Sequence, residues 1–186
     1  MATKDAIEII INDHNTVRGL FQKIKDSTDP VVRRENMNLV IKELCQHSEA
    51  EELVVYPALR TMNHNLGNNY ADRSINEHLA VKNTLARLDG LDATSPEFDV
   101  QFNILVREIE QHTLEEETQV LPFMRQHMTK DDLHTMANLF EGAKIVSPTR
   151  PHPSAPTNPV AKGLVAPITA FIDRLKDAGR QFPEQK

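Results

Sequence analysis

The chain has 186 residues and a formal net charge of −6, and 39% of its residues are hydrophobic. This length predicts one domain with room for a substantial core. The acidic balance and the lack of any Lys/Arg cluster argue against nucleic acid as the main partner. Cys45 is the single cysteine, which excludes an internal disulfide and fits a reducing compartment. Because the N-terminal stretch lacks the apolar core of a signal peptide and no long apolar run follows, we expect a cytoplasmic protein without a membrane partner.

Apolar residues recur at the 3.6-residue period of an amphipathic helix over four long stretches. Thr3 or Asp5 can cap the first helix, which is expected to end near Ser27. The others cover about residues 31–62, 71–89 and 96–127, with a loop over 63–69. Pro57 lies inside the second helix and removes a backbone donor, so we expect a bend about one turn after Glu51. Four long helices joined by short connections predict an all-α, up-down antiparallel four-helix bundle.

The composition changes after the fourth helix. Thr129 can cap a short fifth helix over 130–142, and five of the 11 prolines then fall between Pro148 and Pro159, which predicts an extended arm. A final amphipathic helix is expected over 164–178. Its apolar stripe comprises Leu164, Ile168, Phe171, Ile172 and Leu175. We therefore predict a bundle with its fifth helix over 1–146, and an arm over 147–186 that packs on the bundle or on a partner subunit of a homodimer.

One motif occurs twice. HSEAEELVVYP covers 47–57 and HTLEEETQVLP covers 112–122. A further histidine precedes each copy, His14 by 33 residues and His78 by 34. Residues i and i+4 share one face of a helix, so each copy directs an imidazole and a carboxylate toward one point.

Imidazole and carboxylate together are ligands of iron, manganese or zinc. One isolated HxxxE pattern is more often a solvated helix face, but two copies with matched upstream histidines favour a metal site. Four histidines and two glutamates are too many for one tetrahedral zinc, and they suit two metals bridged by the carboxylates. In an antiparallel bundle, Arg18 and Lys82 lie level with Glu43 and Glu108. We expect these four charges either to form ion pairs beside the metal layer or to be ordinary surface charges.

The set His14, His47–Glu51, His78 and His112–Glu116 resembles the hemerythrin-like (HHE cation-binding) family, over residues 1 to about 127. In ferritin-like di-iron proteins the carboxylate precedes the histidine, with the spacing Glu-x-x-His, whereas here the histidine comes first. The resemblance implies two iron ions that share an oxo or hydroxo group and are bridged by Glu51 and Glu116. It further implies that His14 and His47 hold one iron, and that His78 and His112 hold the other.

One position departs from the oxygen-carrying members. They have a further histidine one turn before the third-helix histidine, and this chain has Ser74 there. By count, each iron then keeps an open position. Tyr56 is a weak additional candidate for a ligand, because Pro57 follows it and a bend there would turn it inward. On an ideal helix Tyr56 points away from the metals and packs in the core.

Two functions fit these residues. The first is a non-haem di-iron protein that reacts with O2, peroxide or nitric oxide, and is thus an oxidoreductase in a detoxification role. The second is a module that binds, stores or senses O2 or iron without turnover. In both, the partner is a small diatomic molecule or peroxide, and the missing histidine favours reaction over carriage. A metal-free bundle is the third reading, and it leaves six polar side chains buried at considerable cost.

Overall fold

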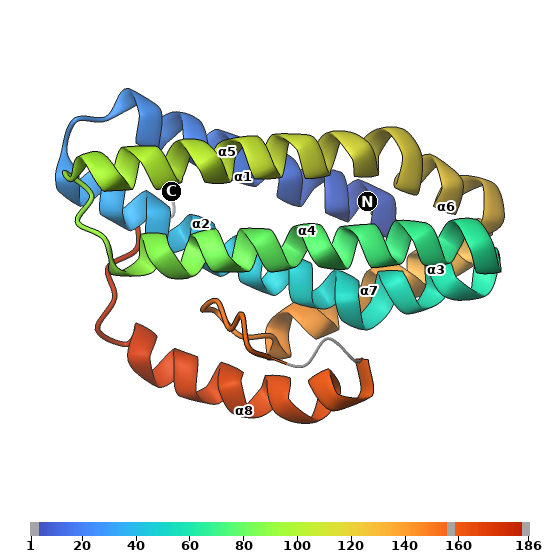
Figure 1. The fold of residues 1–186 in the computed structure, drawn as a ribbon. Coiled ribbons are helices and arrows are strands. Elements are labelled where there is room, and N and C mark those ends of the chain that lie inside the picture. Colours follow the sequence, from blue (N-terminus) through green and yellow to red (C-terminus); the bar gives the residue numbers. More distant parts are fainter. Residues whose placement is uncertain (1–3, 156–158, 184–186) are drawn as a thin grey trace.

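The computed structural model describes residues 4–155 and 159–183, and these form a bundle of antiparallel helices with an attached C-terminal arm (Figure 1). The predicted all-α four-helix bundle is confirmed. The long elements are α1 (Ala6–Asp26), α2 (Pro30–Ala50), α4 (His64–Gly90) and α5 (Pro96–Glu115). Two π-helical turns extend the second and fourth of the expected helices: η1 (Glu51–Val55) leads into α3 (Tyr56–Met62), and η2 (Glu116–Val120) into α6 (Leu121–His127).

Side-chain caps set where these helices begin. Asp5 and Glu8 form a capping box at the start of α1, so Asp5 is the cap, while the alternative Thr3 lies outside the described residues. Asp29 caps α2 and Ser95 caps α5, each followed by a proline in the first turn, where the missing N–H is not needed. The sequence signals for these boundaries were therefore local and sufficient.

The connection expected over 63–69 is wrong. Asn63 accepts hydrogen bonds from the next backbone N–H groups and caps α4, which already begins at His64. A Cβ atom on Gly67 would lie 1.9 Å from the carbonyl oxygen of Leu59. Because Gly67 has no side chain, the backbone of α4 can contact the backbone of α3 at this point. The glycine therefore lies inside a helix and does not mark a loop.

The irregularity predicted about one turn after Glu51 takes the form of a π-helical turn before Pro57. The N–H of Tyr56 donates to the carbonyl of Glu51, five residues back, and the N–H of Leu121 does the same to Glu116. Each π-helical turn therefore contains one residue more than an α-helical turn, and a single residue separates it from the following proline. The extra residue rotates the following helix by about 100°, so Tyr56 faces the core.

The apolar core has two parts, one on each side of a polar layer. Phe21, Met37, Leu85 and Phe102 belong to the cluster at the end where α1 meets α2. Ile10, Leu59, Met124 and Phe140 belong to the cluster at the other end. The layer between them contains the histidines and glutamates of the duplicated motif.

The fifth helix and the arm cover one side of the bundle. α7 (Lys130–Val146) packs against α1, α2 and η1, and its capping box joins Thr129 to Asp132. The arm then runs back to α8 (Pro159–Asp177), which begins earlier than the expected 164. Asp173 of α8 is fully buried and accepts hydrogen bonds from the backbone N–H groups of Thr149 and Arg150, which fixes the arm to α8.

The apolar stripe of the last helix does not pack on the bundle, which was one of its two expected partners. Ala166, Ala170 and Asp173 face the rest of the chain, whereas Ile168 and Phe171 lie on the exposed side. The side chain of Leu164, also expected in this stripe, lies outside the described part of the chain. Small residues allow close approach to the bundle, which explains why this face packs inward.

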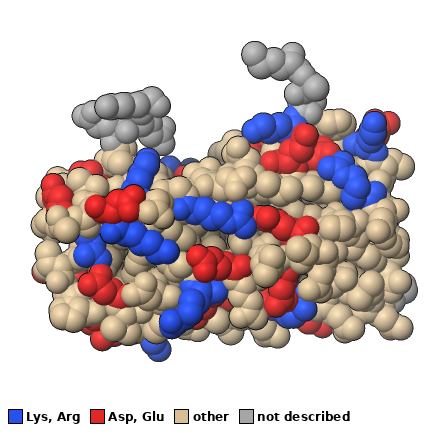
Figure 2. Space-filling view, turned by 90° about the horizontal axis from the view of Figure 1, so that it is seen from above, with Lys and Arg blue, Asp and Glu red and all other residues tan. Residues whose placement is uncertain are grey.

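Among the described residues, no helix combines the length and apolar character that crossing a membrane requires. Basic and acidic side chains are interspersed over the face seen in Figure 2.

Candidate metal centre

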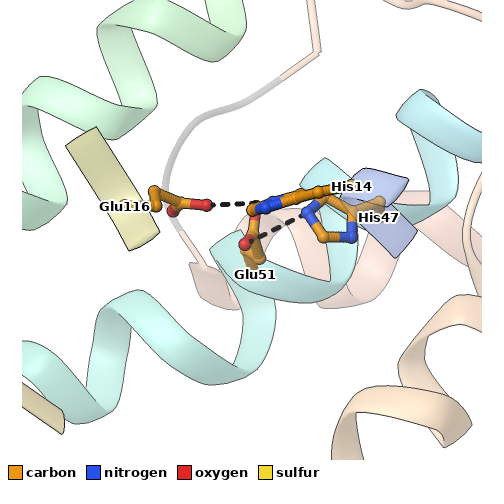
Figure 3. Close-up of side chains that lie close together, drawn as sticks. All are labelled: His14, His47, Glu51 and Glu116. Carbon is orange, nitrogen blue, oxygen red and sulfur yellow. Dashed lines mark ion pairs between the residues drawn. The ribbon is translucent and has the colours of Figure 1, made fainter. Parts of the chain in front are cut away.

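All six predicted site residues are buried and meet in the polar layer of the bundle. Two groups have ligand atoms that lie within 4.8 Å of one another. The first contains His14, His47, Glu51 and Glu116, as seen in Figure 3, and the second contains Glu51, His78 and His112. The duplicated sequence motif thus forms one continuous cluster rather than two separate sites.

Each glutamate lies between histidines of both groups. The carboxylate of Glu51 lies 3.2 Å from Nε2 of His47 and 3.3 Å from Nε2 of His78. The carboxylate of Glu116 lies 3.4 Å from Nε2 of His14 and 3.6 Å from Nε2 of His112. This placement is what two bridging carboxylates require.

The outward-facing nitrogen of every site histidine contacts a second carboxylate. Because a carboxylate only accepts, Nδ1 of each ring carries a proton toward it, which leaves Nε2 directed to the centre as the atom that would bind a metal. Carboxylate partners of this kind orient metal-binding histidines and raise their basicity. The four pairs are His14–Glu117 at 2.8 Å, His47–Asp13 at 3.0 Å, His78–Glu52 at 3.1 Å and His112–Glu77 at 2.8 Å.

Sequence reasoning missed these four acids, although the repeat contains them. Asp13 and Glu77 each precede an upstream histidine by one residue, and Glu52 and Glu117 each follow a motif glutamate by one. The repeat therefore extends beyond the inner residues to their partners. Comparing the neighbours of each site residue between the two copies would have found them.

The predicted ion pairs form with other acids. Arg18 pairs with Glu117 at 2.8 Å, and Lys82 pairs with Glu52 at 2.8 Å, rather than with Glu43 and Glu108. Glu52 and Glu117 are nearer because they lie at the level of the histidine rings, beside the motif glutamates. Each base thus neutralises a carboxylate that holds a site histidine.

These contacts shift the acidities of the buried groups. Burial alone would lower the pKa of His47, but the Glu51 and Asp13 carboxylates raise it to about 10. Burial opposes charge on His78 in the same way, and Glu51 and Glu52 raise its pKa to about 9. Burial would raise the pKa of Glu51, yet the adjacent His47 and His78 hold it well below its usual range. Without metal, His47 and His78 are therefore imidazolium groups beside the ionised carboxylate of Glu51.

Tyr56 belongs to this layer. Its hydroxyl group lies 3.1 Å from Nε2 of His78, 3.2 Å from Glu116 and 3.3 Å from Glu51. Burial, followed by the charges of the surrounding glutamates, raises its pKa well above the usual value, and an interaction with the Ser74 hydroxyl opposes that rise. Ser74 is buried and faces the layer as expected, and the phenol lies beside it.

Four inward atoms in this layer are buried and have no hydrogen-bond partner in the described structure. They are Nε2 of His14, Nε2 of His47, Oε1 of Glu51 and Oε2 of Glu116. These atoms contact one another, His47 with Glu51 at 3.2 Å and His14 with Glu116 at 3.4 Å, but none of them makes a hydrogen bond. Buried polar atoms nearly always make one, so this convergence of nitrogen and carboxylate atoms indicates a missing partner. A cation meets this requirement, and nitrogen and carboxylate ligands suit iron, manganese or zinc. The residues therefore fit a metal centre.

A cavity adjoins the histidine side of the layer. Its lining includes all four site histidines, and Glu43 also lies there instead of pairing with Arg18. Each of the four long helices contributes one apolar side chain, and these are Val17, Leu44, Val81 and Ile109. The cavity therefore combines metal-binding side chains with apolar ones, as small-molecule sites commonly do.

Three further histidines and the cysteine lie apart from the layer. His127 and His134 are exposed, and His152 contacts Asp173 of α8 at 2.9 Å, which gives it a structural role in the arm. Burial raises the pKa of Cys45 to about 12, so this thiol stays protonated, as expected of a core cysteine.

Comparisons with known proteins agree with this geometry. The family model for the hemerythrin HHE cation-binding domain matches residues 5–124. An uncharacterized hemerythrin-like protein of Schizosaccharomyces pombe is 31% identical over 176 residues, covering 95% of this chain and 87% of that protein. A DNA nickase of Nostoc sp. is 28% identical over 137 residues, which are 74% of this chain but 38% of the nickase. The crystal structure of an HHE cation-binding domain-containing protein from Mycobacterium kansasii shares the fold, with a TM-score of 0.66, 22% identity, and coverage of 77% of this chain and 86% of that one.

Proposed function

The chain belongs to the hemerythrin HHE cation-binding family, and from that premise we propose that it is a non-haem di-iron protein that reacts with O2, peroxide or nitric oxide. The observation that carries the proposal is the set of four buried, converging atoms of His14, His47, Glu51 and Glu116, which make no hydrogen bond. His14 and His47 would hold one iron, His78 and His112 the other, and Glu51 and Glu116 would bridge them. Iron bound there supplies the electrons for reducing a small oxidant, or accepts them from a small reductant.

The surrounding residues hold the inner ones in place. Four carboxylates bonded to Nδ1 keep the histidines in one tautomer, and Arg18 and Lys82 balance two of these negative charges. The cavity lined by Val17, Val81 and the site histidines is small, with room for little more than a water-sized molecule. A bulky substrate does not fit such a space, and this supports small partners.

Tyr56 supports reaction over reversible carriage. Its phenol lies within hydrogen-bond distance of both proposed bridging carboxylates and of His78. While protonated it can deliver a proton at the centre of the layer, and once ionised it offers an oxygen ligand. An oxygen carrier needs neither property, so we propose Tyr56 as a further iron ligand or proton donor.

Reaction of the iron-loaded protein with O2, hydrogen peroxide and nitric oxide, each in the presence of an excess of a chemical reductant, tests the proposal. Consumption of many molecules per iron, followed optically and with electrodes, is expected for at least one of the three. Stoichiometric uptake without further turnover would instead support a binding or storage module.

A matched pair of variants locates the reaction. Val81→Met narrows the cavity and should slow the reaction severalfold at unchanged iron content. Val100→Met, which makes the same change at an exposed position of α5, should not slow it. Equal rates in the two variants would place the reaction outside this cavity.

A further inference from the structure

α8 presents a large apolar face to solvent. Ile168 is 63% exposed, Phe171 64%, Ile172 44% and Leu175 63%. We call these four residues the α8 stripe. Their spacing of i, i+3, i+4 and i+7 puts them on one side of the helix, opposite Ala166, Ala170 and Asp173, which face the bundle. α8 is also an outer layer of the molecule in Figure 1, so the stripe faces away from the bundle core.

This arrangement reverses the usual orientation of an amphipathic helix. A helix bound to its own bundle normally buries its large apolar side chains and exposes its small ones. Here contacts that involve Asp173 and Asp177 hold the small-residue face inward, because both carboxylates bind the arm at Thr149 and Arg150. The α8 stripe therefore stays available for another molecule.

We infer that the α8 stripe is a homodimer interface, in which the stripes of two copies pack antiparallel about a two-fold axis near Phe171. The inference is independent of the metal chemistry. A face of this spacing is self-complementary, since its ridges fit the grooves of an identical helix. From typical side-chain areas, one stripe exposes roughly 500 Å², so that two together reach about 1,000 Å², where specific interfaces begin.

The charges around the stripe favour a second copy over a lipid surface. Two bases, Arg174 and Lys176, lie at exposed positions in the described part of α8, and Arg174 is directed to the backbone carbonyl of Ile145 rather than outward. Helices that lie on membranes carry several bases on their polar face. Two antiparallel copies would also place their Lys176 residues about 14 Å apart, beyond the range of strong repulsion at physiological salt.

The full-length, iron-loaded protein tests this inference by light scattering or sedimentation over micromolar concentrations. The expected mass is twice that of the 21.1 kDa chain. Phe171→Glu should restore the mass of a single chain, while Val100→Glu, at an exposed position of α5, should leave the dimer intact. A wild-type protein that stays monomeric throughout, or a Phe171→Glu protein that stays dimeric, would overturn the assignment.

Two further measurements separate the possible occupants. Phe171→Cys should form a disulfide-linked dimer under mild oxidation, because the native Cys45 is buried and equivalent residues meet at the axis. A Val100→Cys control should not, and equal cross-linking of the two variants would contradict the interface.

Co-sedimentation with vesicles of neutral and anionic phospholipid should leave the wild type in the supernatant. Vesicle binding by the wild type that Phe171→Glu abolishes would show that the stripe is a lipid-binding face instead.

Discussion

The two halves of the site have different surroundings. In one half, Glu117 contacts His14 and pairs with Arg18 at the surface. In the other half, Glu52 contacts His78 and pairs with Lys82 beneath the arm. The side chains of Arg18 and Glu117 are 37% and 27% exposed, whereas those of Lys82 and Glu52 are 13% and 2% exposed. The arm causes this difference, because His152 and Lys82 line the same small cavity. Duplication thus produced two equal sets of inner residues in unequal surroundings.

The two halves also differ in the side chains that reach the layer of histidines and glutamates. Tyr56 follows η1 and reaches the site, whereas its counterpart after η2 is Leu121. Both residues stand directly before a proline, and a π-helical turn directs both inward. The same kind of π-helical turn therefore places a phenol in one half of the site and an aliphatic side chain in the other.

The largest effect is expected from the residues that the two halves share. Glu51→Ala and Glu116→Ala should each lose most of the iron, since each carboxylate contacts one histidine of either half. The lost metal should lower the stability by about 3 kcal/mol or more, because metal binding adds to folding free energy. Metal analysis and urea unfolding measure both losses. His134→Ala, at an exposed histidine, should change neither, and an equal iron loss there would disprove the ligand set.

The next largest effect should distinguish Tyr56 from Leu121, the residue at the equivalent position in the other half of the site. Tyr56→Phe removes a hydroxyl group that contacts three site residues, so the optical spectrum and the reaction rate of the iron protein should both change. Leu121→Phe changes the equivalent position of the other half without altering any polar contact, and it should retain the spectrum. Identical spectra for Tyr56→Phe and the parent would show that the phenol does not act at the metals.

A smaller effect should come from the two outer bases. Lys82→Met leaves Glu52 buried without its cation and should cost about 3 kcal/mol of stability. Arg18→Met removes a more exposed pair and should cost less than about 1 kcal/mol. Urea unfolding of the two variants gives the comparison, and equal losses would show that the arm does not alter the electrostatics of its half.

The smallest effect at neutral pH is expected for the stability of the metal-free protein. The folded-state pKa values of His47 and His78, about 10 and about 9, lie above the value of about 6.5 in an unfolded chain. Their stabilising charge is therefore fully present below pH 6.5 and is lost as the pH rises through 9 to 10. Thermal unfolding of the metal-free protein should show this decline, and the iron-loaded protein, with neutral imidazoles, should show less of it. Equal decline in both forms would contradict metal binding by these histidines.

Sequence patterns located the inner site because it depends on local spacing. His47 and Glu51 share a helix face by periodicity alone, and the caps Asp5, Ser95 and Thr129 are short-range signals. Tyr56 could be offered only as an additional candidate that a change of backbone at Pro57 would turn inward, since a π-helical turn depends on backbone bonding that a 3.6-residue period does not contain. The inward face of α8 was missed for a related reason. Hydrophobicity favoured burial of the stripe, whereas the buried contacts of Asp173 decide the orientation.

Metal content measured together with the Mössbauer spectrum tests the central claim most directly. Full-length protein expressed in iron-rich medium should contain two irons per chain, and the spectrum should show a coupled pair whose two sites differ, as their surroundings do. One zinc per chain, no metal, or two uncoupled irons would contradict the account of a single carboxylate-bridged centre built from the duplicated motif.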